Sequence, residues 1–338
     1  MRNITIKDIA RELRISISTV SRALAGEKNV KASTREMVQE TAKRMGYRPN
    51  PTATAMKSGH SNTIGVVVPE MLTPFAGKFI HGIQDFLYPH GIKVIVANSE
   101  ESPERELANV EMMHNFMVDG IIISICSWQR NIEYYRKLMD EGQNIVFIDR
   151  IPQGIDAPMV VVDNYEKAYE LVDHMVKSGR RRIAFIGSET GGDVDVYNSV
   201  IREQGYKDAL KDNGMEYDED LVVKAEKLRF ENGKNAAEKL LDKDIDGVFA
   251  FTDTLALGAI NKFHEKGLRV PEDIAVAGYS GTELALVPHP HLTTVEPPLR
   301  QMGEAAAELL LNNIRNKEKS NSTIVLEGKI LLRESTGD

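Results

Sequence analysis

The sequence of 338 residues predicts an α/β protein that begins with a small all-helical head. In residues 1–49, apolar residues recur at helical spacing in three short segments. From residue 62 onward, short β-rich runs alternate with amphipathic helices, which favours parallel sheets with helices on both faces. Because about 275 residues is long for one such unit, we expect two lobes, each built on a doubly wound parallel sheet.

The charge distribution separates the head from the rest of the chain. Residues 1–60 contain 12 Lys and Arg against 5 Asp and Glu, a net charge of +7, whereas the remainder carries −15 and the whole chain −8. A basic head on an acidic body is typical of local phosphate binding. A solvated basic helix face explains the same charge equally well.

Composition indicates where in the cell the protein is expected. No run of about 18 apolar residues is present, so we expect no membrane segment and no membrane partner. The first residues lack the apolar core of a secretory signal. Cys126 is the only cysteine and cannot form an internal disulfide, so a reducing, cytoplasmic location fits.

The three helices of the head are predicted from their capping residues. Thr5 with Asp8, and Ser33 with Glu36, form the capping-box pattern, which predicts the starts of the first and third helices. Ser16 predicts the start of the second helix after a tight turn. Two helices joined in this way are typical of a helix-turn-helix, whose second helix enters the DNA major groove.

The first turn of the second helix carries the candidate base-reading side chains. Ile17 is apolar but stands on the side of the helix that has no core to join, so it could press on a thymine methyl group. Arg22 could bond a guanine edge or a phosphate. The alternative is that Ile17 is an ordinary surface isoleucine.

The α/β body is predicted from its apolar periodicity. The expected strands are residues 64–68, 93–97, 120–125, 145–149, 160–162, 183–186, 248–251 and 274–279. The expected helices between them include residues 75–88, 104–117, 165–177 and 255–266.

These motifs resemble the lactose-repressor (LacI/GalR) family of transcription regulators. In the head, the resemblance lies in residues 5–10 (TIKDIA), 16–24 (SISTVSRAL), 30–35 (VKASTR) and 46–50 (GYRPN). In the body, it lies in residues 64–69 (IGVVVP), 119–122 (DGII), 148–150 (IDR), 182–187 (RIAFIG), 253–258 (DTLALG) and 292–295 (LTTV). It therefore runs along the whole chain, and the head motif is the more specific part.

The resemblance implies a homodimer that binds a pseudo-palindromic operator in double-stranded DNA. Base reading would fall to Ile17, Ser18 and Arg22. Phosphate contacts would fall to the polar residues Thr5, Ser16, Thr19, Ser21, Asn29, Thr34 and Tyr47. A hinge helix would lie in the minor groove through Asn50, Ala53 and Met56, where Met56 replaces the family's usual leucine wedge.

The resemblance also implies the domain boundaries. Residues 1–49 would form the helix-turn-helix domain and 50–61 the hinge. Residues 62–338 would form a two-lobed effector-binding and dimerisation domain, similar to periplasmic binding proteins. We expect the N-terminal lobe at about 62–161 and 293–325, and the C-terminal lobe at about 162–292 and 326–338.

A small-molecule effector is expected in the cleft outside the carboxyl ends of the strands. The candidate effector-binding residues are Phe75, Ser124, Trp128, Asp149, Arg202, Thr252, Asp253 and Ser280. By resemblance, Asp149, Arg202, Thr252 and Ser280 match positions where the family contacts its effector. A carboxylate with an arginine fork suits sugar hydroxyls or a phosphate, so a sugar and a sugar phosphate both stay open.

Three of these candidates have competing structural explanations. Asp253 fits a helix N-cap better than a ligand contact. Phe75 could be core or a ligand platform, and Trp128 could stack on a sugar ring or pack against its lobe. Thr252 and Ser280 replace the Asn and Asp that are common in sugar-binding members, so the effector's identity stays open.

Other function classes are less well supported. His289 and His291 lack a partner at metal-ligand spacing, and no cofactor motif or catalytic cluster is evident, so we expect neither a metal nor an enzyme. An exported solute-binding protein would need a signal and no basic head. A repressor of carbohydrate genes is the leading hypothesis. The sequence does not separate repressor from activator or inducer from co-repressor, and the absence of a terminal leucine heptad favours a dimer over a tetramer.

Overall fold

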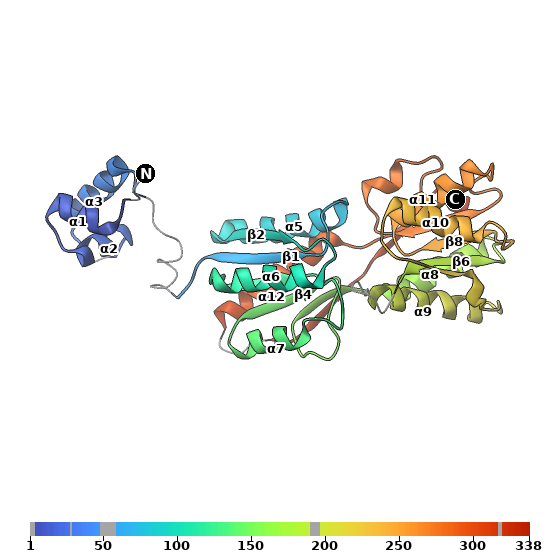
Figure 1. Ribbon diagram of the computed structural model, residues 1–338, viewed down its shortest axis with the longest axis horizontal. Coiled ribbons are helices and arrows are strands. Elements are labelled where there is room, and N and C mark those ends of the chain that lie inside the picture. The colour runs from blue at the N-terminus through green and yellow to red at the C-terminus, as the bar shows by residue number, and fades with distance from the viewer. Residues whose placement is uncertain (1–3, 28, 48–58, 190–196, 317–319) are drawn as a thin grey trace. The chain divides into compact units, whose positions relative to one another are not determined.

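The computed structural model describes residues 4–27, 29–47, 59–189, 197–316 and 320–338. The chain forms two compact units, Met1–Ser61 and Asn62–Asp338 (Figure 1). The predicted hinge residues Asn50, Ala53 and Met56 lie outside the described residues. Within the described part of the chain, no helix is both long and apolar enough to cross a membrane.

The head contains the three predicted helices, α1 (Ile6–Leu13), α2 (Ile17–Leu24) and α3 (Ala32–Met45). Its small core consists of the buried apolar side chains Ile9, Ala10, Val20, Ala23, Val38 and Ala42. Each helix therefore packs one apolar face against the others, and burial of these faces holds the unit together.

The predicted capping residues hold for two of the three head helices. At α1, the Asp8 carboxylate accepts hydrogen bonds from the backbone N–H (3.0 Å) and the hydroxyl (2.7 Å) of Thr5. At α2, the Ser16 hydroxyl accepts from the backbone N–H of Thr19 (3.1 Å). The prediction that Ser33 caps α3 is wrong. The helix starts two residues earlier, because the Lys31 carbonyl already accepts the hydrogen bond from the Arg35 N–H.

The body contains two six-stranded sheets, each the centre of one lobe (Figure 1). The sheet of the first lobe has the strand order β11-β5-β4-β3-β1-β2. Its strands are β1 (Thr63–Val68), β2 (Lys93–Asn98), β3 (Gly120–Ile123), β4 (Asn144–Ile148), β5 (Met159–Val162) and β11 (Thr323–Leu326). Every neighbouring pair in this sheet is parallel.

The sheet of the second lobe has the strand order β12-β10-β9-β8-β6-β7. Its strands are β6 (Ile183–Ser188), β7 (Val222–Ala225), β8 (Gly247–Ala250), β9 (Ala275–Tyr279), β10 (Thr293–Glu296) and β12 (Lys329–Leu331). Only β10 and β12 pair antiparallel, at one edge. The predicted fold class, a helical head followed by doubly wound parallel sheets, is confirmed.

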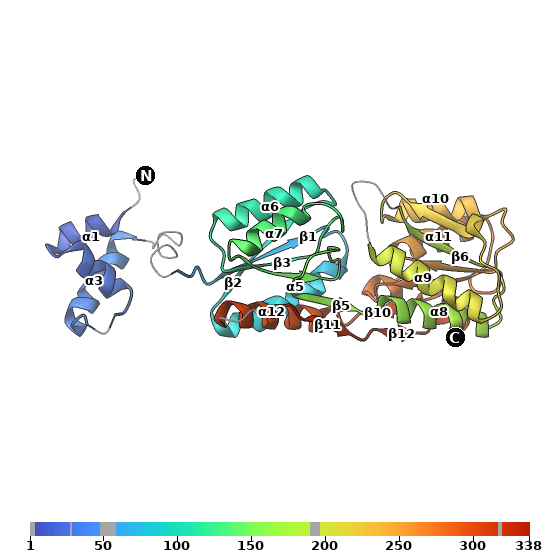
Figure 2. The ribbon, with the colours of Figure 1, turned by 90° about the horizontal axis from the view of Figure 1, so that it is seen from below.

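Helices cover both faces of each sheet, as Figure 2 shows. The first lobe has α5 (Pro74–Leu87) and α12 (Leu299–Arg315) on one face, and α6 (Pro103–Asn115) and α7 (Ile132–Asp140) on the other. The second lobe has α8 (Asn164–Lys177) and α9 (Tyr197–Asp212) on one face of its sheet, and α10 (Phe230–Leu240) and α11 (Asp253–Glu265) on the other. Short 3₁₀ helices lie at Tyr88–His90 (η1), Glu219–Leu221 (η2), Glu283–Leu286 (η3) and Glu334–Thr336 (η4).

One predicted lobe boundary needs correction. Residues 293–296 were expected in the first lobe, but they form β10, which pairs with β9 and β12 of the second. Val295 is buried in the core of that second lobe, and this burial fixes the strand there. The chain therefore returns to the first lobe only after Glu296. The eight predicted strands and four predicted helices of the body otherwise lie within two residues of the observed bounds.

Candidate functional site

The outward face of α2 exposes the predicted base-reading residues. Ile17 has 45% of its surface exposed, and Ser18 and Arg22 are also exposed. On the opposite face, Val20 and Ala23 are fully buried in the head core. The helix therefore buries one face and presents the other, which is the arrangement that a groove-reading helix requires.

The polar side chains at the start of α2 bond to one another. The Ser16 hydroxyl lies 2.8 Å from the hydroxyl of Ser18 and 2.8 Å from that of Thr19. Arg22 makes only a loose contact, with 3.9 Å between its Nε and the Glu27 carboxylate. A hydroxyl can exchange such local bonds for a phosphate oxygen, and the Arg22 guanidinium is available to an incoming partner.

The remaining predicted phosphate contacts lie in different settings. Thr5 is engaged by the capping box at α1. Asn29 is exposed, and Ser21, Thr34 and Tyr47 are partly buried, Tyr47 against the head core. These residues come from several parts of the head, so the geometry alone does not assign a phosphate to each.

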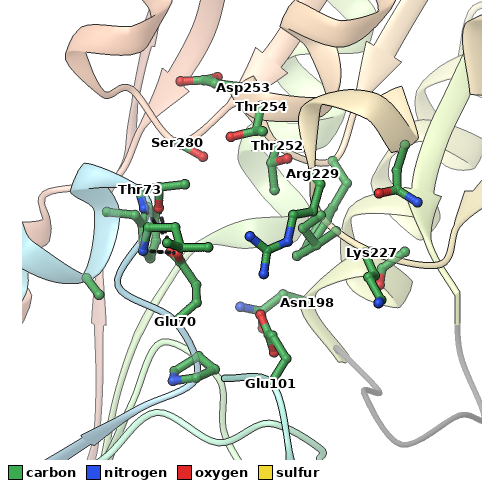
Figure 3. Close-up of a pocket in the computed structure, with 18 of the residues that line it drawn as sticks. Glu70, Thr73, Glu101, Asn198, Lys227, Arg229, Thr252, Asp253, Thr254 and Ser280 are labelled. Carbon is green, nitrogen blue, oxygen red and sulfur yellow. Dashed lines mark hydrogen bonds between the residues drawn. The ribbon is translucent and has the colours of Figure 1, made fainter. Parts of the chain in front are cut away.

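The body contains a cavity of about 1050 Å³ at the carboxyl ends of the strands, lined by residues of both lobes (Figure 3). Of the eight predicted effector-binding residues, seven line it: Phe75, Ser124, Asp149, Arg202, Thr252, Asp253 and Ser280. Trp128 does not line it. Its ring packs instead on Tyr197 at the start of α9, with 5.3 Å between the ring centroids.

Asp149 lies at the junction of the two lobes. It follows β4 of the first lobe and is buried, and the Asn198 side-chain amide of α9 donates to both its carbonyl and its carboxylate oxygen, each at 3.3 Å. Burial raises the pKa of the Asp149 carboxyl, while the Arg150 and Arg202 guanidinium groups oppose that rise. Sequence reasoning did not find Asn198, because a single amide on a helix carries no motif.

Arg202 is almost completely buried in the second lobe. Its Nε donates to the Asn164 side chain (2.8 Å) and its Nη1 to the Phe251 carbonyl (2.7 Å). The guanidinium carbon lies 3.3 Å from the ring centroid of Tyr279, a close cation–π contact. Burial lowers the pKa of Arg202, although nearby acidic groups counteract this. The side chain is thus held in one orientation before any ligand arrives.

The expected role of Asp253 as a helix N-cap is wrong. Thr252 caps α11 by accepting from the Leu255 N–H, and Asp253 is the first helical residue. The buried Asp253 carboxylate accepts from the Thr294 hydroxyl (2.5 Å) and from the backbone N–H of Thr282 (3.4 Å). Burial raises its pKa to about 6, despite these hydrogen bonds.

Several cavity side chains lack a hydrogen-bond partner among the described residues. Two buried hydroxyls, of Ser124 in the first lobe and Thr282 in the second, have none. Figure 3 shows the guanidinium of Arg229 projecting into the cavity, and no hydrogen bond or ion pair to a described residue engages it. Buried polar groups are normally satisfied, so unsatisfied ones at a cavity wall indicate a ligand site.

The charged residues of the cavity wall are more often acidic than basic. Among the described lining residues, eight are Asp or Glu and four are Lys or Arg. One basic and one acidic residue of the wall bind each other, because Nη1 and Nη2 of Arg150 donate to the Glu101 carboxylate at 2.7 and 3.0 Å. The electrostatic environment therefore disfavours a strongly anionic ligand.

Comparison with known proteins identifies the family. Residues 5–50 match the family model described as bacterial regulatory proteins, lacI family, and residues 172–336 match a periplasmic binding protein-like domain. Catabolite control protein A of Priestia megaterium is 34% identical over 337 residues, covering 99% of both chains. The chain belongs to the LacI family. It is therefore a DNA-binding transcription regulator and not an enzyme.

Other LacI-family proteins match along nearly the whole chain. The transcriptional repressor CytR of Escherichia coli is 29% identical, over 98% of this chain and 96% of its own. The structure of the regulator CelR with cellobiose is 30% identical, with a TM-score of 0.75, over 98% of this chain and 100% of that one. The Lac repressor dimer bound to operator has a TM-score of 0.84 at 22% identity, which shows the shared fold.

Proposed function

We propose that this LacI-family regulator is a cytoplasmic repressor of carbohydrate genes that binds its operator as a homodimer. In each half-site, Ile17, Ser18 and Arg22 would read base edges in the major groove, because they form the exposed face of α2. Phosphate contacts fall to the hydroxyls and amides around them: Thr5, Ser16, Thr19, Ser21, Asn29, Thr34 and Tyr47. The hinge, with Asn50, Ala53 and Met56, would enter the minor groove beside its twin.

Exposed apolar side chains on the first lobe support the homodimer. Ile95 on the edge strand β2 and Met112, Phe116 and Met117 at the end of α6 are between 38% and 57% exposed. The outer edge of a sheet beside exposed apolar side chains is a surface that soluble proteins usually cover. A second copy of the chain would cover it and would bring two heads onto one pseudo-palindromic site.

The effector we propose is an uncharged sugar bound in the cavity between the lobes. The observation that carries this proposal is that Asp149, Arg202, Thr252 and Ser280 converge there beside the unpartnered Ser124 and Thr282 hydroxyls. Carboxylates, hydroxyls and a guanidinium match the donors and acceptors of a sugar. The excess of acidic residues disfavours a sugar phosphate. The cellobiose complex of the similar regulator CelR supports the assignment.

Effector binding would control operator affinity through closure of the two lobes. Asn198 of the second lobe already bonds Asp149 of the first, so a ligand at Asp149 changes the contact between the lobes. A ligand that binds one closure state better shifts the population toward that state. The DNA-binding heads of the dimer would respond to this shift.

A thermal-shift screen tests the effector assignment. The panel contains neutral monosaccharides and disaccharides, including ribose and cellobiose, together with their phosphorylated counterparts. We expect a neutral sugar to raise the melting temperature, by more the tighter it binds, and its phosphorylated form to raise it less. Stabilisation by the phosphorylated forms alone would contradict the uncharged class, and stabilisation by none would contradict the cavity as a sugar site.

A further inference from the structure

Three residues at the cavity wall of the first lobe have a left-handed backbone conformation. Glu100 and Glu101, which follow β2, have φ angles of 50° and 57°, and Asp149, which follows β4, has a φ of 62°. Residues other than glycine rarely adopt this conformation, and it persists only where the surroundings hold it. Such residues cluster at functional sites. The contacts that hold their backbone therefore show which parts of the site are kept rigid.

The Glu101–Arg150 ion pair is the support that joins these two loops. Arg150 donates from Nη1 to Oε2 (2.7 Å) and from Nη2 to Oε1 (3.0 Å) of Glu101. Both side chains are largely shielded, with 12% and 22% exposure, so the pair is less screened than a surface ion pair. The Glu101 N–H also donates to the Pro69 carbonyl at 2.7 Å, which anchors this loop to the end of β1.

Contacts on both sides of Asp149 along the chain hold its backbone. Its own N–H donates to the Val160 carbonyl at 2.9 Å, and the next residue, Arg150, is clamped by Glu101. The backbone on each side of Asp149 is therefore fixed, which limits the positions that its carboxylate can take. At the cavity wall that carboxylate accepts a hydrogen bond from the Asn198 amide.

We infer that the Glu101–Arg150 pair is a positioning device that holds the Asp149 carboxylate in place for the effector's hydroxyls. The inference deepens the proposed function and rests on it. Neither residue of the pair needs to touch the effector for this role. A rigid carboxylate accepts two hydroxyl hydrogen bonds with little loss of side-chain entropy, so loss of the clamp weakens binding without removing a contact.

A thermodynamic cycle separates positioning from general stabilisation. The variants are Arg150→Lys, which keeps the charge but loses the two-pronged geometry, Asp149→Asn, and the two combined. The ligand is the sugar of the ribose- and cellobiose-containing panel that binds wild type most tightly, and its affinity is measured by calorimetry. If Arg150 acts through Asp149, Arg150→Lys weakens binding about tenfold in wild type and hardly at all in the Asp149→Asn background.

The pH dependence of binding separates the charge of Arg150 from its two-pronged geometry. The charged groups facing Asp149 are Arg150, Arg202 and Glu101, and Asn198 adds a neutral amide. Arg150 lowers the pKa of Asp149, so Arg150→Gln raises it further. The acid limb of sugar affinity is then expected at higher pH in Arg150→Gln than in wild type, and at the wild-type position in Arg150→Lys.

Asp273→Asn serves as the matched control. It breaks another two-pronged pair, Arg269 with Asp273, at 2.7 and 2.9 Å, on the exposed surface of the second lobe. We expect its sugar affinity to match wild type.

If Arg150→Lys also binds like wild type, or if its effect adds in full to that of Asp149→Asn, the positioning role is refuted while the sugar site stands. If wild type binds no sugar of the panel, the proposed function and this inference fail together. Should Arg150→Gln not fold, the double variant Glu101→Gln/Arg150→Gln, which leaves neither partner of the ion pair as an unpaired charge, replaces it.

Discussion

The head and the body place their functional residues in opposite ways. In the head, Ile17, Ser18 and Arg22 lie within six residues of one helix and are exposed. In the body, Asp149, Arg202 and Ser280 come from distant segments and meet at one cavity, two of them almost fully buried. The head therefore depends on a surface that one helix creates, and the body on the packing of two lobes. The two units should respond differently to salt, to burial of charge and to truncation of a side chain.

The largest expected difference is in the response to salt. Operator binding by the basic head releases counterions, so its affinity should fall by about 10³-fold or more between about 50 and 200 mM salt. Sugar binding in the shielded cavity should change by less than about twofold over the same range. Fluorescence anisotropy of labelled operator and calorimetry with sugar measure the two. Equal salt dependence of both would remove the contrast.

The next largest effect is expected at Arg202. Replacing it with Met removes a buried guanidinium that bonds Asn164 and the Phe251 carbonyl. We expect sugar affinity to fall by about 100-fold, since the loss of one partner of a buried charged contact costs about 3 kcal/mol. Operator affinity without sugar should stay at the wild-type value. An Arg202→Met protein whose operator affinity still responded to the same sugar concentration would show that the cavity does not control the head.

A pH effect on stability is expected in the body from Asp253. Its pKa is raised to about 6 in the folded state from an ordinary 3.8, so the folded protein binds this proton more tightly than the unfolded chain. Its contribution to stability is therefore fully present below about pH 4 and is lost as pH rises through about 6, amounting to about 3 kcal/mol. Urea unfolding of wild type and Asp253→Asn at about pH 5 and pH 8 measures it. Between these two pH values the stability difference between the two proteins should change by about 1.4 kcal/mol, because the unfolded chain has already lost most of this proton at about pH 5. A constant difference would contradict the raised pKa.

The smallest expected effect is on base preference. Ile17→Ala should reduce the preference for operator over scrambled DNA by about fivefold in each half-site, because one apolar contact to a thymine methyl is worth about 1 kcal/mol. Met37→Ala is the matched control, since Met37 on α3 is 41% exposed against 45% for Ile17. Competition binding with operator and scrambled duplexes distinguishes them. If both variants lost the same preference, Ile17 would have no reading role.

The elements of the fold were predictable because their signals are local. Capping at Thr5 and Ser16 and the apolar runs of the central strands depend on neighbouring residues, and the structure has them where expected. Of the edge strands, β2 was expected, but β7, β11 and β12 were not among the expected strands. β7 buries only alternate residues and β12 spans three, so neither has a strong apolar run. The assignment of β10 to the second lobe depends on its partners β9 and β12, and such pairing is not encoded in the strand itself.

The candidate cavity was predictable to the extent that its residues follow strands. Asp149, Thr252 and Ser280 each come directly after a strand or one residue beyond its end. Trp128 illustrates the limit of this rule, because its packing on Tyr197 depends on how α9 meets the first lobe. The same meeting brings Asn198 to Asp149. The pairing of Glu101 with Arg150 likewise joins loops that are 49 residues apart, and no sequence pattern links them.

Selection of bound duplexes from a random DNA pool, with and without the sugar panel, determines whether the head reads a specific DNA sequence. We predict one enriched motif with two-fold symmetry, bound at least about 10³-fold more tightly than scrambled sequence. We also expect Ile17→Ala to lose discrimination at one base pair in each half of that motif. Recovery of no preferred sequence under any of these conditions would contradict sequence-specific DNA binding by the head.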